Sequence, residues 1–267
     1  MTAPPGPGAV PVTVVIAAHN EALQIEECVR SVAWAAEVLV VENDSTDDTI
    51  ALAKAAGATV FSHSFRSIGT QRNAAIARAR HDWVLVVDAD ERATPALGAE
   101  VSRRIGAQDG EAFRVRRRNW FLGREIRHSG WDRDRPVRLF RSTLRYDERP
   151  VHEHVLTKSE PGTLDEALLH RPYSNLGEFF EKLGRYSRDW AVQNHARGRK
   201  VWLPSLLVRP QARFLTTLVL RGGWRDGWQG VAISALAAVS VASKYAHLWA
   251  LQHEAQSGAR GDGSWPS

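Results

Sequence analysis

The chain has 267 residues, of which 43% are hydrophobic and 24% are charged, and this composition is ordinary for a globular protein. The length suffices for one substantial α/β domain with additions, or for two small domains. One cysteine, Cys28, excludes an internal disulfide framework and is typical of a reducing cytoplasm. The net charge is +5, and residues 113–149 hold twelve Arg against five Asp plus Glu, which indicates an anionic partner such as phosphate, nucleic acid or a lipid headgroup.

Residues 1–10 have neither a basic region nor an apolar core of the kind found in secretory signals, and we expect a disordered lead-in. The next hundred residues alternate between apolar strand patterns and helix patterns. The expected strands are Val12–Ala18, Glu37–Val41, Thr59–Phe61 and Trp83–Val87, and the helices that follow them end near Val32, Ala56, Ala79 and Ile105. Ser45 or Thr46 is the expected N-cap of the second helix, and Thr94 that of the fourth. This alternation predicts an α/β fold, a Rossmann-like, mostly parallel sheet with helices on both faces.

Two carboxylates, Asp88 and Asp90, follow the buried Trp83 strand directly. Open α/β sheets bind their ligands outside the carboxyl ends of such strands. Because two neighbouring carboxylates repel each other unless a cation lies between them, the Asp-x-Asp pattern favours Mg²⁺ or Mn²⁺. The alternative is a simple strand-to-loop turn in which an Asp caps the next element.

Other polar residues follow the first and second strands, namely Asn20 and Glu21, and residues 42–44. All would lie at the same edge of the sheet as the two carboxylates, where a nucleotide is expected to bind. The chain has no Gly-x-Gly-x-x-Gly after its first strand and no P-loop sequence. It therefore lacks the motifs that identify dinucleotide-binding and P-loop proteins.

Residues 111–174 change character and are interpreted as an acceptor side folded over the nucleotide edge. Short strands are expected at Phe113–Arg117 and Val137–Phe140, and between them lies a loop of aromatic, Gly, Arg and Asp residues. Residues 11–110 would then form the nucleotide-binding half of the same domain.

From Asn175 the pattern is helical, and residues 175–254 form a predicted helical extension. The uncharged stretch Trp228–Ser243 has sixteen residues, fewer than the ~20 needed to span a bilayer. Two interpretations stay open for the extension: helices that pack on the catalytic domain, or a monotopic membrane surface with Trp, Tyr and basic residues at the interface. Residues 255–267 are expected to be a disordered tail.

Assembled in order, these motifs resemble family 2 glycosyltransferases of the GT-A fold. The resemblance rests on Val14–Glu21, Val41–Thr49 and Val87–Glu91. Within the family the chain is most similar to the lipopolysaccharide core β-1,4-glucosyltransferase group, on the evidence of Asn119–Gly123, His128–Trp131, Arg138–Arg141, Val151–Glu153 and Lys244–Tyr245. Glu42 and Asp44 depart from the Asp and Gly usual in the family, and Arg133 stands where a Pro often precedes the acceptor-side Asp.

The resemblance implies inverting transfer of a hexose from a nucleoside diphosphate sugar, with uridine as the expected base, and a requirement for Mg²⁺ or Mn²⁺. The donor-binding residues that it implies are Ala18, Asn20, Glu21, Glu42, Asn43, Arg72, Asp88, Ala89 and Asp90. The implied metal ligands are Asp88, Asp90 and His152, with His152 also interpreted as a phosphate contact or a packed core residue. Asp134 is the expected general base, with Asp132 and Glu153 as alternatives, and Trp131 and Arg138 are expected to bind the acceptor. The alternative role of Asp134 is a surface salt bridge to Arg133, Arg135 or Arg138.

Residues 113–149, the Arg-rich middle of the chain, would suit a phosphorylated, lipid-linked saccharide such as the lipopolysaccharide inner core. Arg can pair with phosphate through two parallel hydrogen bonds. The protein is then expected in the cytoplasm, peripheral on the inner face of the cell membrane, with no nucleic acid as a partner. Two rivals remain: transfer to a polyprenyl phosphate, and a non-catalytic basic protein that binds nucleic acid or the membrane surface.

Overall fold

The computed structural model describes residues 9–62, 64, 67–147, 149, 153–173 and 175–258. The chain forms two compact units. The first unit contains the residues up to Trp120 together with Arg133–Pro172, and the second contains Phe121–Asp132 together with the residues from Tyr173 onward. The region expected at residues 111–174 is therefore divided between the two units.

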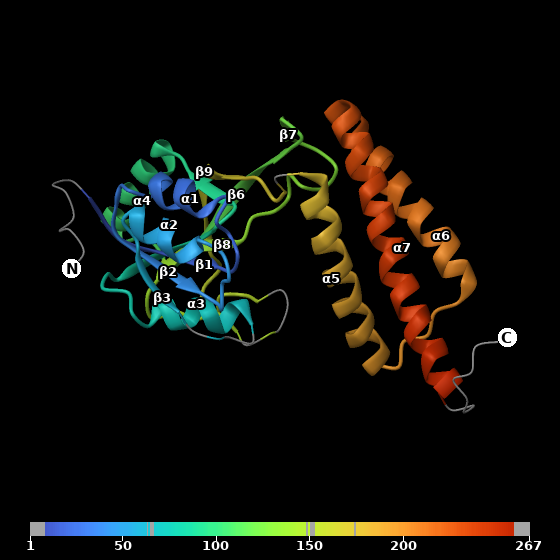
Figure 1. The fold of residues 1–267 in the computed structure, drawn as a ribbon. Helices are drawn as coiled ribbons and strands as arrows, with labels where there is room; N and C mark the ends of the chain where they lie inside the picture. The colour runs from blue at the N-terminus through green and yellow to red at the C-terminus, as the bar shows by residue number, and fades with distance from the viewer. Residues whose placement is uncertain are drawn as a thin grey trace. The chain divides into compact units, whose positions relative to one another are not determined.

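The first unit is built on one mixed sheet with the strand order β3-β2-β1-β4-β8-β6-β9-β5 (Figure 1). The strands are β1 (Val10–Ala18), β2 (Ala35–Glu42), β3 (Thr59–Ser62), β4 (Trp83–Asp88), β5 (Glu91–Ala93), β6 (Ala112–Phe121), β8 (Val137–Arg141) and β9 (Gly162–His170). The four strands β3, β2, β1 and β4 are parallel, as expected from their helical crossovers. The strand β8 is antiparallel to both β4 and β6, and β9 runs parallel to β6 and antiparallel to β5.

Helices cover both faces of this sheet, so the expected fold class is confirmed. They are α1 (Ile25–Ser31), α2 (Thr49–Ala55), α3 (Ile68–Ile76) and α4 (Pro95–Ala107). The helices α1, α2 and α4 contribute to the core on one face, and α3 contributes to the core on the other.

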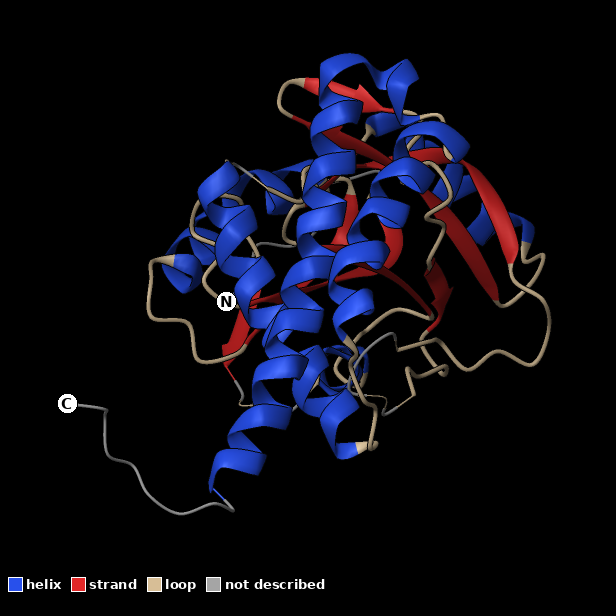
Figure 2. Cartoon of the chain, turned by 90° about the vertical axis from the view of Figure 1, so that its right-hand side faces the viewer, coloured by secondary structure: helices blue, strands red, loops and turns tan. Residues whose placement is uncertain are grey.

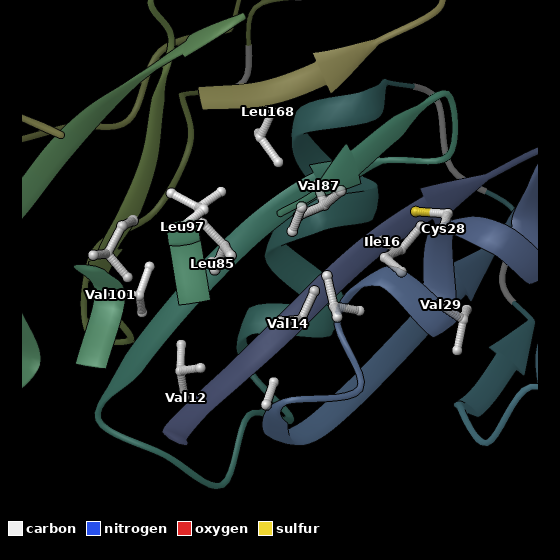
Figure 3. Close-up of a cluster of buried hydrophobic side chains, with 14 of the residues drawn as sticks. Val12, Val14, Ile16, Cys28, Val29, Leu85, Val87, Leu97, Val101 and Leu168 are labelled. Carbon is white, nitrogen blue, oxygen red and sulfur yellow. The ribbon is translucent and has the colours of Figure 1, made fainter. Parts of the chain in front are cut away.

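Alternation along the strands explains how one sequence supplies both cores. On β1, Val14 and Ile16 point to the face covered by α1, whereas Val15 points to the face covered by α3. Figure 3 shows the first of these cores, where Leu85 and Cys28 are fully buried. Truncation of a buried Leu to Ala typically costs about 2–5 kcal/mol. Burial also raises the pKa of the Cys28 thiol, so this free cysteine stays protonated in the core.

Several local expectations are corrected by the structure. The helix α2 follows Asp48, and neither Ser45 nor Thr46 caps it. Asn119–Phe121 belong to β6 and not to a loop, and neither the three-residue strand β5 nor the nine-residue strand β9 was predicted. In contrast, the Thr94 side chain caps α4 as expected, by accepting a hydrogen bond of 3.1 Å from the N–H of Leu97.

The second unit is mainly helical. Its elements are β7 (Arg124–Ile126), α5 (Leu176–Ala196), α6 (Leu203–Leu215), the π-helix η1 (Thr216–Leu220), the 3-10 helix η2 (Gly223–Asp226) and α7 (Gly227–Gly258). The long helix α7 packs against both α5 and α6 and lies between them (Figures 1 and 2).

The helix α7 is longer than the uncharged stretch in the sequence, because charged and polar residues continue the same helix beyond Ser243. Residues Gly223–His253 are long enough and apolar enough to cross a membrane, with a mean hydropathy of 1.4 and 22% of the most apolar window buried. The prediction that this segment is too short to span a bilayer is therefore wrong as regards length. The core helix of a soluble protein meets the same criterion of length and composition.

Candidate functional site

The loops that follow β1 and β2 are joined into one platform at the carboxyl edge of the sheet. The side-chain oxygen of Asn20 accepts a hydrogen bond of 2.8 Å from the N–H of Thr46, and the N–H of Asn20 donates to Ser45 Oγ at 3.1 Å. Asn20 adopts a left-handed backbone with φ 54°, which Asn tolerates better than most residues. The N–H of Asn43 donates to the carbonyl of Ala18 at 3.0 Å. The expected donor residues Ala18, Asn20 and Asn43 thus lie together.

A buried glutamine clamps this platform from α3. The amide of Gln71 donates to the carbonyls of Ala18, at 3.3 Å, and of Val41, at 2.8 Å, at the ends of the two strands. Glu21 joins the platform through its N–H, which donates to Thr49 Oγ1 at 2.8 Å. Buried carbonyls with such partners hold the edge of the sheet rigid.

Glu42, one of the residues that depart from the family pattern, is buried beneath the platform. Its carboxylate accepts a hydrogen bond of 2.8 Å from the N–H of Ser45. Burial by itself raises the pKa of Glu42, but the hydrogen bonds from Ser62 and Ser45 outweigh burial and lower it. The carboxylate therefore supports the loop after β2.

The carboxylate of Asp88, at the end of β4, lies among three guanidinium groups. Arg72 of α3 pairs with its Oδ1 atom. Arg117 of β6 pairs with its Oδ2 atom at 2.5 Å, and Arg138 of β8 pairs with the same oxygen. Burial raises the pKa of Asp88, but the charges of Arg138, Arg72 and Arg117 outweigh burial and hold the pKa well below the ordinary value. Asp88 is thus an anion held by arginines from one helix and two strands.

Glu91, on β5, is the second carboxylate of this cluster and is fully buried. Its Oε1 atom accepts from Arg117 and, at 3.2 Å, from Arg138, and its Oε2 atom accepts from the N–H of Asp88 at 2.8 Å. Opposite charges at this distance offset the cost of removing each one from water. We call Arg72, Arg117, Arg138, Asp88 and Glu91 the arginine cluster.

The arginine cluster reaches two of the three expected general bases. Arg117 pairs with Asp134 Oδ2 at 2.9 Å, and Arg72 pairs with Glu153. Asp134 therefore forms its ion pair with Arg117, and not with the neighbours Arg133, Arg135 or Arg138 that its sequence position suggested. The Asp134 side chain is 45% exposed and that of Glu153 is 13% exposed, so Asp134 is the more accessible to an incoming substrate.

Asp90 is separate from the arginine cluster and lies beside an imidazole. Its Oδ2 atom is 3.3 Å from Nε2 of His170, at the end of β9. The Nδ1 atom of the same ring lies 2.6 Å from Asn119 Oδ1, an oxygen that can only accept a hydrogen bond. Nδ1 carries the hydrogen when it donates to that oxygen. In the neutral ring, Nε2 then has a lone pair. The Oδ1 atom of Asp90 is buried and has no hydrogen-bond partner among the described residues.

A buried carboxylate oxygen without a donor, beside an imidazole nitrogen, fits a divalent cation. Oxygen and imidazole ligands suit Mn²⁺, and Mg²⁺ takes the carboxylate with waters and phosphate oxygens. Within the ranges that the structure describes, no three His, Cys, Asp or Glu side chains converge on one point. A cation held by Asp90 and His170 would therefore complete its coordination with the ligands of a bound diphosphate.

The structure changes the interpretation of three expected site residues. Both oxygens of Asp88 are engaged by guanidinium groups, which leaves Asp90 as the carboxylate that can take a metal. Arg138, expected at the acceptor, is 2% exposed and lies inside the arginine cluster. Ala89, expected at the donor, packs its side chain into the core, so it can meet a ligand only through its backbone.

Three other expected residues lie outside the described part of the first unit. Trp131 and Asp132 belong to the second unit, where Trp131 packs against Phe121 with a ring separation of 5.9 Å and Asp132 is exposed. His152 lies outside the described residues.

The residues that the sequence analysis missed are Gln71, Glu91, Arg117 and His170. Glu91 adjoins the Asp-x-Asp pattern and could have been found from its place after β4. Arg117 is one of twelve arginines in its region, and nothing local distinguishes it. His170 ends a strand whose Asp, Glu and Ala residues have low strand propensity, so the strand itself was missed.

Comparison with sequence models of protein families identifies one family. Residues 13–164 match the sequence model of glycosyl transferase family 2. The lipopolysaccharide core biosynthesis glycosyltransferase LpsC of Rhizobium meliloti is 28% identical over 230 residues, which cover 83% of this chain and 85% of that protein. A glycosyltransferase of Rickettsia bellii is 32% identical over 207 residues, which cover 71% of this chain and 69% of that protein.

Among solved structures, the glucosyl-3-phosphoglycerate synthase of Mycobacterium tuberculosis, in complex with Mn²⁺, uridine diphosphate and glucosyl-3-phosphoglycerate, is 24% identical with a TM-score of 0.37. The similarity covers 40% of this chain and 44% of that one, so this chain spans less than half of the solved structure.

Proposed function

Because this chain belongs to glycosyl transferase family 2, we propose that it transfers a hexose, with inversion, from a uridine diphosphate sugar to a phosphorylated, lipid-linked saccharide such as the lipopolysaccharide inner core. The observation that carries the proposal is the pair formed by Asp90 and His170. This pair supplies a carboxylate and an imidazole at the carboxyl edge of the sheet, where the loops after β1 and β2 also begin.

The donor would lie across this edge. The base and ribose would contact the platform formed by Ala18, Asn20, Glu21 and Asn43, with Glu42 supporting it from below. The diphosphate would approach Asp90, His170 and the rim of the arginine cluster. When bound, Mg²⁺ or Mn²⁺ supplies Lewis-acid stabilisation of the charge that develops on the leaving diphosphate.

Asp134 is our candidate for the general base. The acceptor hydroxyl attacks the anomeric carbon, its proton passes to the Asp134 carboxylate, and the bond from the anomeric carbon to the diphosphate oxygen breaks. Arg117 holds Oδ2 of Asp134, and no donor from the described residues engages Oδ1, so that oxygen can receive the proton. Glu153, which pairs with Arg72 of the arginine cluster, is one alternative base, and Asp132 of the second unit is the other.

The acceptor is proposed from similarity and charge. A relative that matches most of the chain is a lipopolysaccharide core biosynthesis glycosyltransferase, and a phosphorylated saccharide suits the Arg-rich middle. Such an acceptor would place the protein at the inner face of the cell membrane. The apolar helix α7 and the exposed tryptophans Trp202, Trp224 and Trp228 support a membrane-surface location.

The proposal is tested first by thermal unfolding of the purified protein with uridine, guanosine, adenosine, cytidine and thymidine diphosphates, each with and without Mn²⁺. We expect stabilisation by uridine diphosphate that depends on the metal, because a ligand that binds only the folded state raises its stability. The Asp90→Asn variant should lose this effect and the exposed Asp165→Asn variant should keep it.

The second step separates the acceptors. Radiolabelled uridine diphosphate hexose is supplied with either deacylated inner-core saccharide, intact inner-core lipid or polyprenyl phosphate. Transfer to inner-core lipid supports the proposal, and transfer to polyprenyl phosphate alone establishes the rival transferase. Absence of any nucleotide effect, together with binding of oligonucleotides, would reject the enzyme and favour the basic binding protein.

A further inference from the structure

The second unit contains a pocket of about 470 Å³ that plays no part in the donor site. Its lining comes from α5, α6 and α7 and from the aromatic residues Phe121, Trp131 and Tyr173. The volume lies within the range typical of small-molecule sites, roughly 300–1,000 Å³. All the lining residues belong to the second unit, so the pocket is complete within that unit.

Most of the wall is apolar and rigid. Phe121 and Ile233 are almost fully buried in a small core that Trp131 and Tyr173 complete. The Phe121 and Trp131 rings meet edge to face at 5.9 Å, and Tyr173 meets Phe179 in the same way at 5.1 Å. Packed aromatic rings of this kind form a surface suited to an alkyl chain or a flat apolar group.

Two cations face this apolar wall without an acid to neutralise them. Arg213 of α6 and Lys244 of α7 line the pocket, with the hydroxyl residue Ser240 one helical turn before Lys244. Neither cation forms an ion pair or a hydrogen bond with any residue that the structure describes. Burial lowers the pKa of Lys244, and the charge of Arg213, which lines the same pocket, lowers it further. Burial also lowers the pKa of Arg213, with a smaller contribution from Arg221.

The surrounding sequence strengthens the charge argument. Residues 203–253 contain Arg209, Arg213, Arg221, Arg225 and Lys244 against one acid, Asp226. The carboxylate of Asp226 is already used by the N–H groups of Arg127 and His128 and by the ring of His128. Two half-buried, adjacent cations are stabilised when an anion binds between them.

The same unit also carries exposed apolar side chains. On η1, directly after α6, Val219 and Leu220 are exposed, and the exposed Trp224 on η2 and Trp228 at the start of α7 follow. Tryptophan and basic residues together are typical of a protein surface at the headgroup level of a membrane. An occupant of the pocket that comes from a bilayer is therefore favoured over a soluble nucleotide or sugar.

We propose that this pocket binds a phosphorylated lipid, with the phosphate between Arg213 and Lys244 and the alkyl portion against Trp131, Phe179 and Ile233. The inference rests on the proposed function, because it names the part of the protein that would hold the lipid portion of the acceptor. Binding in this pocket differs from general membrane attachment, because the ligand must carry a phosphate and an alkyl chain on one molecule.

The test uses the full chain and dodecyl phosphate below its critical micelle concentration. Binding is followed by the fluorescence of Trp131, identified by the difference from a Trp131→Phe variant, and by thermal unfolding. Inorganic phosphate and the neutral amphiphile dodecyl maltoside are run at the same concentration. We expect a saturable response to dodecyl phosphate alone, and a loss of affinity of roughly tenfold or more in the Arg213→Gln/Lys244→Gln double variant, because hydrogen bonds to charged groups are the strong ones.

The matched control is Arg188→Gln, which removes a cation from an exposed position of α5 outside the pocket and should bind as the unmodified chain does. An equal response to dodecyl maltoside would show an apolar pocket with no phosphate site, and an equal response to inorganic phosphate would show an anion site with no lipid site. Either result, or unchanged binding by the double variant, overturns the proposal.

Uridine diphosphate binding is measured on the same double variant. Loss of lipid binding with intact, metal-dependent nucleotide binding is the expected pattern. If nucleotide never binds but dodecyl phosphate does, the proposed transferase fails and the pocket stands. If nucleotide binds but dodecyl phosphate does not, the pocket fails and the transferase stands.

Discussion

Nε2 of His170 lies 3.3 Å from Oδ2 of Asp90, and this contact joins the end of β9 to the loop after β4. The two residues approach because β9 is paired with β5, where Glu91 lies opposite His170. A strand that sequence patterns did not predict therefore brings an imidazole nitrogen to the Asp-x-Asp loop.

The first prediction concerns this pair. His170→Ala should weaken binding of Mn²⁺, measured in the presence of uridine diphosphate, by roughly tenfold or more, since loss even of a residue that supports a ligand costs 10–100-fold. The measurement is a Mn²⁺ titration followed by thermal unfolding, with Asp165→Asn as the control. Unchanged Mn²⁺ affinity would mean that His170 serves only to orient Asn119.

The second prediction concerns the arginine cluster. Asp88→Asn should lower the free energy of unfolding by about 3–5 kcal/mol, because it leaves three guanidinium groups with one buried carboxylate fewer. The comparison is Glu160→Gln, which removes an exposed partner of Arg114 at 2.7 Å and should cost about 0–1 kcal/mol. Urea unfolding at neutral pH measures both variants, and equal small losses would contradict the role given to the cluster.

The third prediction is the pH dependence of the same residue. The folded-state pKa of Asp88 is held well below its ordinary value, so the unfolded chain binds the proton more readily. The stabilisation is present above the unfolded pKa of about 4, and is lost as the pH falls through the folded pKa. Unfolding free energies between pH 7 and pH 3 should fall more steeply for the unmodified chain than for Asp88→Asn. Parallel curves would refute this assignment.

The fourth prediction separates the candidate bases. Asp134→Asn should lower kcat by about 10²–10⁴-fold with little change in donor affinity, because general base catalysis contributes that much and the exposed side chain supports no core contact. Glu153→Gln should instead weaken donor binding, because it releases Arg72. Steady-state kinetics with varied donor distinguishes the two effects. Should Asp132→Asn alone reduce kcat, the base would come from the second unit.

The fifth prediction concerns the membrane surface. Trp224→Ala and Trp228→Ala should each reduce binding to vesicles that contain an anionic lipid by roughly tenfold, since each removes a large exposed aromatic surface from the interface. Vesicle flotation measures the change, and Tyr186→Ala on α5, which is also exposed, is the comparison. Equal losses for all three would indicate a non-specific apolar effect.

Sequence patterns determined the features that depend on neighbouring residues. Continuous runs such as Trp83–Val87 identify buried strands, because each side chain of a doubly covered strand must be apolar. Thr94 and Pro95 mark a helix start because both act within one turn. The positions of Asp88 and Asp90 at the strand end follow from the same local rules.

Tertiary structure decided which groups these carboxylates meet. Arg117 and Arg138 reach Asp88 because β8 and β6 follow β4 in the sheet, and His170 reaches Asp90 because β9 pairs with β5. Strand order depends on contacts between distant segments, and no local pattern distinguishes one of twelve arginines from the others. The sequence by itself thus determined that an anionic edge exists, whereas the pairing of distant strands decided that Asp88 is neutralised by arginine and that Asp90 is left beside an imidazole.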